Sequence, residues 1–307
     1  RELTMPQVIE PSAGPKRKVV VVGGGPAGLE AARVSAERGH DVVLFEAAPE
    51  LGGQIVIAAK AGWRKDLIGI RDWYADELER LGVDIRSGVY AEAGDVMAEA
   101  PDVVIVAAGG VPDTATAEGA ERHAVSTWDI LAGAVPLGDS VLVYDDNGQH
   151  PGPSCADFLA DRGATVELVT PDRMAAAEMG GLNWTVYLEH FYAKGVRLTP
   201  DTRLVRVEPD GNRFKATLRN AYSDTEETRL VDQVVIEHGT LPMDDVFMAL
   251  RSQSVNDGVT DVEALAAARP QRMPDGDGFV LWRVGDAAAS RNIHAAIYES
   301  LRLCKDL

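Results

Sequence analysis

Three of the four glycines within residues 23–28 form the pattern in this sequence that is most directly tied to chemistry. They follow an apolar run of valines and open a helical pattern that extends to Arg38. In such a strand-turn-helix unit, Gly23 permits the tight turn, Gly25 lets the backbone approach phosphate groups, and Gly28 allows close helix packing. The helix N-terminus then offers N–H groups and the positive end of its dipole to an anion. The sequence therefore predicts a site for the diphosphate of a dinucleotide.

A carboxylate occurs at the spacing that this kind of turn requires. The run Asp41–Phe45 is typical of a second parallel strand, and it ends in Glu46, 21 residues after Gly25. Dinucleotide-binding units carry an acid there that accepts hydrogen bonds from the adenosine ribose. A glycine-rich turn that binds nothing is the alternative, but strand, spacing, helix and acid together favour the binding site.

A second strand-turn-helix unit begins at Val141–Tyr144, and its turn lacks most of the glycines. The turn has the sequence Asp-Asp-Asn-Gly-Gln-His-Pro-Gly over residues 145–152. Gly152 can serve as the third glycine, but residues with side chains occupy the first two positions, where close backbone approach is needed. Two carboxylates near a diphosphate also oppose its binding. We expect a Rossmann-like domain that has lost nucleotide binding, with retained NADPH binding as the alternative.

The composition is that of an ordinary globular protein. Hydrophobic residues make up 46% and charged residues 25% of the 307 residues, enough for two domains with separate cores. The net charge of −18 argues against nucleic acid as a partner, because no basic face can form. No apolar run approaches the length of a membrane span, and the first residues lack a signal-peptide pattern. We expect a cytoplasmic protein.

The cysteines and the N-terminal segment narrow the class further. Cys155 and Cys304 are too distant in sequence for a C-x-x-C redox pair or a metal-ligand cluster, so we expect no metal site and no dithiol type of reductase. Residues 1–16 are polar and contain several prolines, which is typical of a linker. We expect this linker to follow a missing N-terminal part, with a trimmed N-terminus of a complete protein as the alternative.

The elements that must position these residues alternate between strands and helices, which indicates an α/β fold. We expect two Rossmann-like dinucleotide-binding domains of the glutathione-reductase type, with the second inserted into the first. Residues 17–138 and 241–307 form the first domain, and residues 139–240 form the inserted one. Between residues 202 and 237, alternating polarity predicts an antiparallel meander. The predicted strands are 19–22, 41–45, 83–86, 102–110, 141–144, 165–169, 204–207, 214–218, 233–236 and 280–284, and the predicted helices are 29–38, 66–81, 154–162, 182–194 and 293–304.

Four segments carry a resemblance to a known family. They are residues 23–32, 37–40, 51–54 and the distinctive final stretch 284–297. From Lys16 to Leu307 the chain resembles the C-terminal half of the trimethylamine dehydrogenase, histamine dehydrogenase and 2,4-dienoyl-CoA reductase family of NADH:flavin oxidoreductases. In that family a TIM barrel with FMN and a cysteine-bound 4Fe-4S cluster precede this half. The resemblance implies that FMN and the iron–sulfur cluster belong to the absent N-terminal part, together with the substrate-oxidising residues.

The resemblance assigns nucleotide-binding roles within this chain. Ala108 stands where the family has a threonine, so a hydroxyl contact is not expected there. Asp286 would accept a hydrogen bond from a ribityl or ribose hydroxyl, and His294 would lie near an isoalloxazine; a helix-capping aspartate and a structural histidine are the alternatives. The candidate cofactor-binding residues are Gly23, Gly25, Pro26, Ala27, Gly28, Glu46, Ala47, Gly52, Gly53, Gln54, Ala108, Gly109, Asp286, His294 and Ala295.

The family divides into two groups that differ in the second domain. Its reductases bind FAD in the first domain and NADPH in the second, whereas its amine dehydrogenases hold ADP in the first and pass electrons to an electron-transferring flavoprotein. The altered second turn favours a module of an amine or N-methyl amino acid dehydrogenase, with FAD, or else ADP, in the first domain. The alternatives are an NAD(P)H-dependent enoate or 2,4-dienoyl-CoA reductase and a non-catalytic nucleotide-bound scaffold. The sequence leaves the substrate and the oligomeric state open, a homo-oligomer included.

Overall fold

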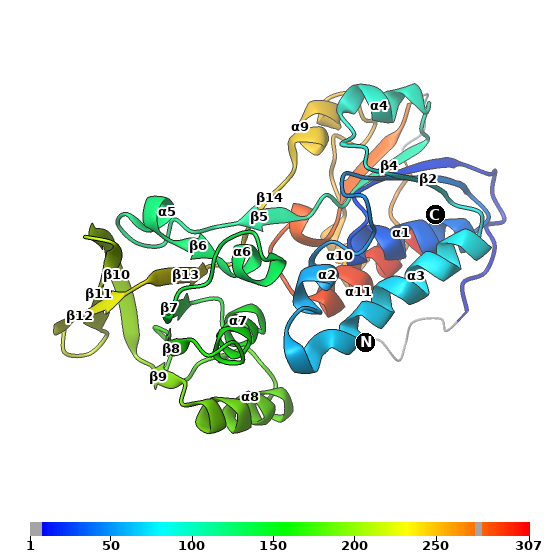
Figure 1. Ribbon diagram of the computed structural model, residues 1–307. Helices are drawn as coiled ribbons and strands as arrows, with labels where there is room; N and C mark the ends of the chain where they lie inside the picture. Colours follow the sequence, from blue (N-terminus) through cyan, green and yellow to red (C-terminus); the bar gives the residue numbers. More distant parts are fainter. Residues whose placement is uncertain (1–7, 274–277) are drawn as a thin grey trace. The chain divides into compact units, whose positions relative to one another are not determined.

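The computed structural model describes residues 8–273 and 278–307, which divide into two units (Figure 1). Unit 1 is formed by the segments up to Val56, Leu67–Val111 and Leu241–Leu307, and unit 2 by Ile57–Asp66 and Pro112–Thr240. In the predicted linker, residues 8–16 form neither helix nor strand, and residues 1–7 lie outside the described part of the chain.

Unit 1 is built on a sheet of five parallel strands in the order β15-β4-β1-β2-β3. The central strand β1 consists almost entirely of valine, and its last four residues are buried. Such continuous apolar runs are characteristic of parallel strands that are covered on both faces. The strands are β1 Lys18–Val22, β2 Asp41–Glu46, β3 Asp84–Ser87, β4 Val103–Val106 and β15 Val280–Arg283.

Helices cover both faces of this sheet. Alternate residues of each strand enter separate apolar cores: Val19 and Val21 lie in one core, and Val20 and Val22 lie in the other. The first core includes helices α1 Pro26–Glu37, α3 Ile68–Arg80 and α11 Ile293–Cys304, with α1 in contact with both others (Figure 1). The second core includes α4 Ala93–Ala98 and α9 Asp245–Arg251. The carboxyl ends of the strands are left for the loops that carry the candidate residues.

Unit 2 has a second parallel sheet, in the order β6-β13-β7-β8-β9, with helices on one face and a meander on the other. Val141 and Val143 of β7 pack against the helices, whereas Leu142 and Tyr144 pack against the meander. The sheet consists of β6 Val125–Ser126, β7 Ser140–Asp145, β8 Thr165–Val169, β9 Arg197–Thr199 and β13 Gln233–Glu237. The helices are α6 Thr127–Ala132, α7 Pro151–Ala160 and α8 Gly181–Lys194, and the meander strands are β10 Thr202–Asp210, β11 Arg213–Asn220 and β12 Glu226–Val231.

The α/β class and the insertion of one Rossmann-like unit into another are confirmed by these sheets, but the division between the units differs from the predicted one. Residues 57–66 cluster with unit 2, where Ala61 is buried in the core beneath the helices, although they were predicted to belong to the first domain. Residues 112–138 were also predicted to belong to the first domain and likewise cluster with unit 2. The reason is that β6 pairs with β13 and thereby joins the second sheet. Because β6 is only two residues long, its sequence carries no strand pattern that could have located the boundary.

The meander also differs from its prediction at one strand. The segment predicted as its third strand, residues 233–236, is β13, which pairs in parallel with β7 and β6. The third meander strand is instead β12, in which only Val231 is buried. The three apolar residues Val234–Ile236 are all buried between the two layers, as a central parallel strand requires. The prediction missed β12 because its first four residues, Glu226–Arg229, are all polar and show no alternation.

Short elements that the sequence analysis did not predict complete the described residues. The strands β5 and β14 pair with each other where the chain passes from one unit to the other. The short elements not predicted from the sequence include α2 Gln54–Ala58, η2 Gly62–Leu67, β5 Gly110–Pro112, α5 Ala120–His123, β14 Thr240–Pro242, α10 Val262–Ala266 and η3 Gly285–Ala287.

Candidate functional site

The glycine turn after β1 is packed so closely that two of its glycines have no room for a side chain. Gly23 has φ +107°, and a Cβ atom on it would lie 2.3 Å from the carbonyl oxygen of Ala107. A Cβ atom on Gly28 would lie 1.8 Å from the carbonyl oxygen of Gly23. Real side chains do not approach backbone atoms this closely, so both positions require glycine. The predicted roles in the tight turn and in helix packing match this geometry.

Gly25 differs because it faces open space. No atom lies within 4 Å of a Cβ built on it, and its φ of −76° is one that any residue adopts. It is the N-cap of α1, and within the described residues no side chain caps this helix or adds an acid to its first turn. The first N–H groups of α1 therefore keep their capacity to bind an anion. A cradle that a side chain would fill fits the diphosphate of a nucleotide.

Glu46 lies against the same turn, at the carboxyl end of β2. One carboxylate oxygen, Oε2, accepts a hydrogen bond from the N–H of Gly24 at 2.6 Å, and Oε1 accepts one from the N–H of Ala48 at 2.6 Å. These bonds fix the carboxylate beside the cradle, and each oxygen retains a second lone pair for a ribose hydroxyl. The neighbouring Ala47 is exposed.

The loop at residues 52–54 also reaches the turn. The N–H of Gly52 donates to the carbonyl oxygen of Gly24 at 2.8 Å, and a Cβ atom on Gly53 would lie 3.2 Å from the Cα atom of Gly25. Gln54 begins α2, and its Nε2 donates to Oδ2 of Asp286 at 2.8 Å. The structure thus joins this loop both to the glycine turn and to the end of β15.

Asp286 lies in the short turn η3, next to the start of α1. The preceding Gly285 has φ +63°, and a Cβ atom on it would lie 2.7 Å from the Cβ atom of Ala27. Oδ1 of Asp286 accepts a hydrogen bond from the N–H of Arg291 at 3.1 Å. Residues from the first, second and last strands of unit 1 therefore meet around one helix N-terminus, as expected at the carboxyl edge of a parallel sheet.

The remaining candidate residues have fewer contacts with the glycine turn. Ala108 lies beside the turn, since its Cα atom would be 2.9 Å from a Cβ on Gly23, and Gly109 has φ +77°. His294 is exposed and stacks on Tyr298 with a centroid distance of 5.9 Å. The N–H of Ala295 donates to the side chain of Asn292, which caps α11. The predicted contacts of His294 and Ala295 with an isoalloxazine stay predictions.

The second turn is filled by one of its own carboxylates. Asp145 is buried, and its Oδ1 accepts hydrogen bonds from the N–H groups of Asn147 at 3.0 Å and Gly148 at 3.1 Å. A Cβ atom on Gly152, near the start of α7, would lie 2.6 Å from the carboxyl carbon of Asp145. The space at which a diphosphate would approach this turn is therefore occupied by the protein itself.

A second buried carboxylate, Glu237, lies beside Asp145 on the neighbouring strand. The two residues are register partners of β13 and β7. Glu237 accepts hydrogen bonds from Thr127 Oγ1 at 2.5 Å, Asn147 Nδ2 at 2.9 Å and the N–H of Gly239 at 3.3 Å. Burial, followed by the charge of Glu237, raises the pKa of Asp145 to about 8. Oδ2 of Asp145 has no hydrogen-bond partner among the described residues, which further disfavours the charged carboxylate, and burial raises the pKa of Glu237 as well.

Several groups in the site had no clear signal in the sequence. Glu237 is one of them, although its position after a buried strand could have indicated it. Glu299 of α11 is another: it accepts a hydrogen bond from the N–H of Gly285 at 3.0 Å, 14 residues away in the sequence. Such contacts depend on how a helix packs, which spacing alone does not give.

The described residues form neither a membrane-spanning helix nor a group of metal ligands. No helix there is both long and apolar enough to cross a bilayer. Nor do three or more His, Cys, Asp or Glu side chains in that part of the chain gather in a way that could hold a metal ion. Cys155 and Cys304 are both buried, and burial raises the pKa of each thiol.

Comparisons with known proteins show which family the chain resembles. The family described as FAD dependent oxidoreductase matches residues 18–85, which include the glycine turn and Glu46. The chain is 50% identical to N,N-dimethylglycine/sarcosine dehydrogenase of Chromohalobacter salexigens over 99% of its own length and 46% of the relative's. It is 45% identical to a probable N-methylproline demethylase of Rhizobium meliloti over 100% of its own length and 45% of the relative's. The chain thus spans about half the length of these curated relatives.

A solved structure shows the same fold. Histamine dehydrogenase from Rhizobium sp. 4-9 superposes with a TM-score of 0.80 at 23% identity, over 98% of this chain and 43% of that chain. The likeness therefore extends over both units, and again only part of the larger protein is matched.

Proposed function

The chain belongs to the family of flavin-dependent oxidoreductases that includes the dimethylglycine/sarcosine dehydrogenase and N-methylproline demethylase above. We propose that it is the adenine-dinucleotide-binding module of an enzyme of this family. The whole protein would be an amine or N-methyl amino acid dehydrogenase or demethylase. These substrates are suggested by the relatives' names and by the altered turn of unit 2.

The open cradle at Gly25 is the observation that carries this proposal. The main-chain N–H groups of Ala27 and Gly28 would hold the diphosphate; Pro26 has no N–H. Glu46 would hold the adenosine ribose. Asp286, fixed by Gln54, would accept a hydrogen bond from a hydroxyl of the cofactor. FAD, when bound, supplies two-electron transfer at its isoalloxazine, whereas ADP in the same place supplies no redox chemistry. The retained loop at 52–54 and Asp286 favour FAD.

We place the substrate-oxidising centre outside this chain. The relatives are about twice as long, and the family resemblance assigns their additional part to a TIM barrel with FMN and a 4Fe-4S cluster. An electron-transferring flavoprotein is the expected electron acceptor of such an enzyme. A cytoplasmic location and the oligomeric state stay predictions.

The nature of the bound nucleotide tests the proposal. We expect nucleotide extraction and mass spectrometry of the purified chain, incubated with FAD and ADP, to recover one of them in stoichiometric amount. Visible flavin absorption would identify FAD; ADP alone would favour the scaffold function. Recovery of neither nucleotide would contradict the proposal.

The variant Gly25→Val is expected to lose nucleotide binding. Its side chain enters open space and its backbone conformation is unstrained, so the fold is expected to persist while the cradle is blocked. Gly69→Ala is the control, because Gly69 also has no atom within 4 Å of its Cβ position but lies away from the turn, in α3. Equal nucleotide retention by both variants would remove the glycine turn from the site.

Nicotinamide nucleotide binding in unit 2 distinguishes the reductase alternative from the proposed function. Because Asp145 occupies the turn there, we expect no saturable binding of NADPH or NADH at micromolar concentration in calorimetric titrations. Saturable binding in that range would favour the NAD(P)H-dependent reductase.

A further inference from the structure

Glu299 of α11 connects the two ends of the loop that presents Asp286. Its Oε2 accepts a hydrogen bond from the N–H of Gly285, at 3.0 Å, and also forms an ion pair with Nη2 of Arg291. Gly285 directly precedes Asp286, and Arg291 lies five residues after it. One carboxylate therefore holds both ends of the short segment between β15 and α11.

Asp286 is tied into the same network. Its Oδ1 accepts a hydrogen bond from the N–H of Arg291 at 3.1 Å, and its Oδ2 accepts one from Nε2 of Gln54 at 2.8 Å. Glu299 thus contacts the guanidinium of Arg291, and the backbone N–H of the same arginine bonds to the Asp286 carboxylate. Gly285 contributes as well, because its φ of +63° permits the turn that places Asp286.

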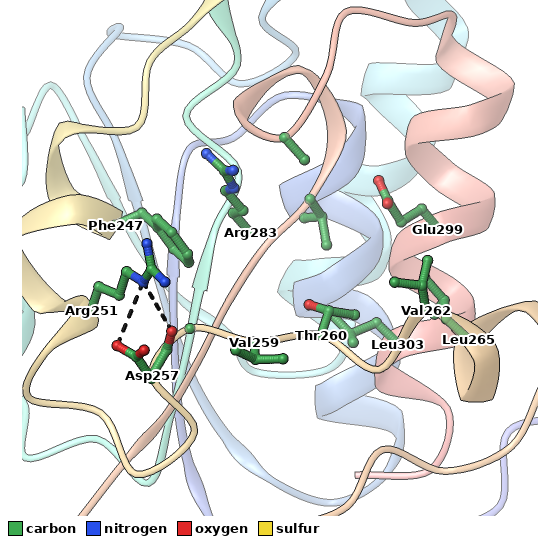
Figure 2. Close-up of a pocket in the computed structure, with 13 residues that line it drawn as sticks. Phe247, Arg251, Asp257, Val259, Thr260, Val262, Leu265, Arg283, Glu299 and Leu303 are labelled. Atoms are coloured by element: carbon green, nitrogen blue, oxygen red, sulfur yellow. Dashed lines mark hydrogen bonds and ion pairs between the residues drawn. The ribbon is translucent and has the colours of Figure 1, made fainter.

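Glu299 is partly buried and borders a pocket. Its side chain is 18% exposed and lies on one wall of a pocket of about 330 Å³. Figure 2 shows Glu299 projecting from α11 on the opposite side of this pocket from Arg251 and Asp257, which pair with each other. Arg291 is 39% exposed, so water still screens the ion pair, and the hydrogen bond from the Gly285 N–H is the better shielded of the two contacts of Glu299.

We propose that Glu299 is a positioning residue for the cofactor: it holds the Gly285–Arg291 segment so that Asp286 presents its carboxylate to a cofactor hydroxyl. The proposal rests on the proposed function, since it assumes that a nucleotide binds beside Asp286. It assigns to α11 the control of how tightly, and in which orientation, the far end of the cofactor is held.

The affinity for FAD, measured by calorimetry with the apo chain, tests this role. Glu299→Ala is expected to weaken binding about tenfold, as the loss of one orienting hydrogen-bonded carboxylate commonly does. Because the residue already borders a pocket, the truncation enlarges existing space, and the apo chain should fold with only a small decrease in melting temperature from the two lost contacts. Glu299→Gln keeps an acceptor for the Gly285 N–H and should retain most of the affinity. Arg251→Ala, in the same pocket, is the control and should bind as the wild type does.

A double-mutant cycle with Asp286→Ala separates positioning from general support. If Glu299 acts through Asp286, then Glu299→Ala should have no further effect on affinity in the Asp286→Ala background. Additive losses, or an unchanged affinity of Glu299→Ala itself, would overturn the inference. Failure of the wild-type chain to bind FAD or ADP would instead contradict the proposed function. If only ADP binds, the ligand has no hydroxyl left for Asp286, because Glu46 holds its single ribose, and the positioning role is overturned.

Discussion

At the scale of single residues, Gly23 and Gly28 of the first turn differ from Gly25 in what a side chain would meet. Gly23 and Gly28 are required by the protein itself, because a side chain on either would collide with backbone. Gly25 has space around it, so the fold does not require glycine there. The space beside Gly25 is the space that a bound diphosphate would need, and this is why Gly25 rather than Gly28 is the residue to test.

Gly28→Ala should impair both folding and binding. Its methyl group would lie 1.8 Å from the Gly23 carbonyl oxygen, so the turn must move. We expect the free energy of unfolding to fall by about 1–3 kcal/mol, in the range of overpacked cores, and nucleotide retention to be lost. Urea unfolding and extraction of the bound nucleotide measure the two effects. An unchanged stability with full retention would show that the turn is looser than the structure indicates.

Asp145 should make stability depend on pH. Its pKa is raised from 3.8 in the unfolded chain to about 8 in the folded one, so the folded state binds the proton more tightly. Its contribution to stability is therefore complete below pH 4 and is lost as the pH rises to about 8, at a slope of about 1 kcal/mol per pH unit.

The variant Asp145→Asn mimics the protonated carboxyl and cannot ionise. Chemical unfolding at pH 5 and pH 8 should show that the variant loses less stability than the wild type over this interval. Asp146→Asn, on the adjacent residue that bonds to His238, is the control. Parallel losses in the wild type and Asp145→Asn would contradict the buried proton.

At the scale of elements, α7 and α8 of unit 2 are joined by one buried carboxylate. Asp157 on α7 is 1% exposed in its side chain and pairs with Lys194 Nζ at 2.6 Å and His190 Nδ1 at 3.0 Å, both on α8. The adjacent turn of α7 supplies Asp161, which pairs with the same Lys194 at 2.6 Å but is 40% exposed. The two acids share one partner and differ in burial.

Replacement of these acids should therefore have unequal effects. Asp157→Ala leaves Lys194 and His190 without their buried partner and should lower the free energy of unfolding by about 3 kcal/mol. Asp161→Ala should lower it by less than about 1 kcal/mol, as for other exposed pairs. Urea unfolding of the two variants measures the difference, and equal losses would show that burial of Asp157 contributes nothing.

At the scale of the whole molecule, the two units share an architecture and differ in what their first turns contain. In unit 1 the turn is open and its helix uncapped, whereas in unit 2 a carboxylate of the chain occupies the corresponding place. The first turn of unit 1 therefore has space that fits a diphosphate, whereas the first turn of unit 2 is filled by the protein.

Hydrogen exchange should reveal this asymmetry. Added FAD or ADP should slow amide exchange at residues 23–28, 46–54 and 285–291 of unit 1, because a ligand that binds only the folded state stabilises it. The matching turn of unit 2, residues 145–152, should exchange at an unchanged rate. Protection of both turns at once would indicate a nucleotide in each unit and would contradict the assignment of unit 2.

The sequence by itself determined the elements that have long, regular patterns. The valine strand, the glycine turn, Glu46 and the order of strands and helices were all recognisable, because tight turns and buried parallel strands restrict residue type at each position. The altered second turn was recognisable for the same reason.

Only the tertiary structure decided which residues meet across long sequence separations. It placed Gln54 on Asp286, Glu299 on Gly285, and the carboxylate of Asp145 within its own turn. It also assigned residues 112–138 to unit 2 and 233–237 to a parallel sheet. These facts depend on strand pairing and helix packing, in which each partner is selected by the space that the others leave, and no local pattern records that space.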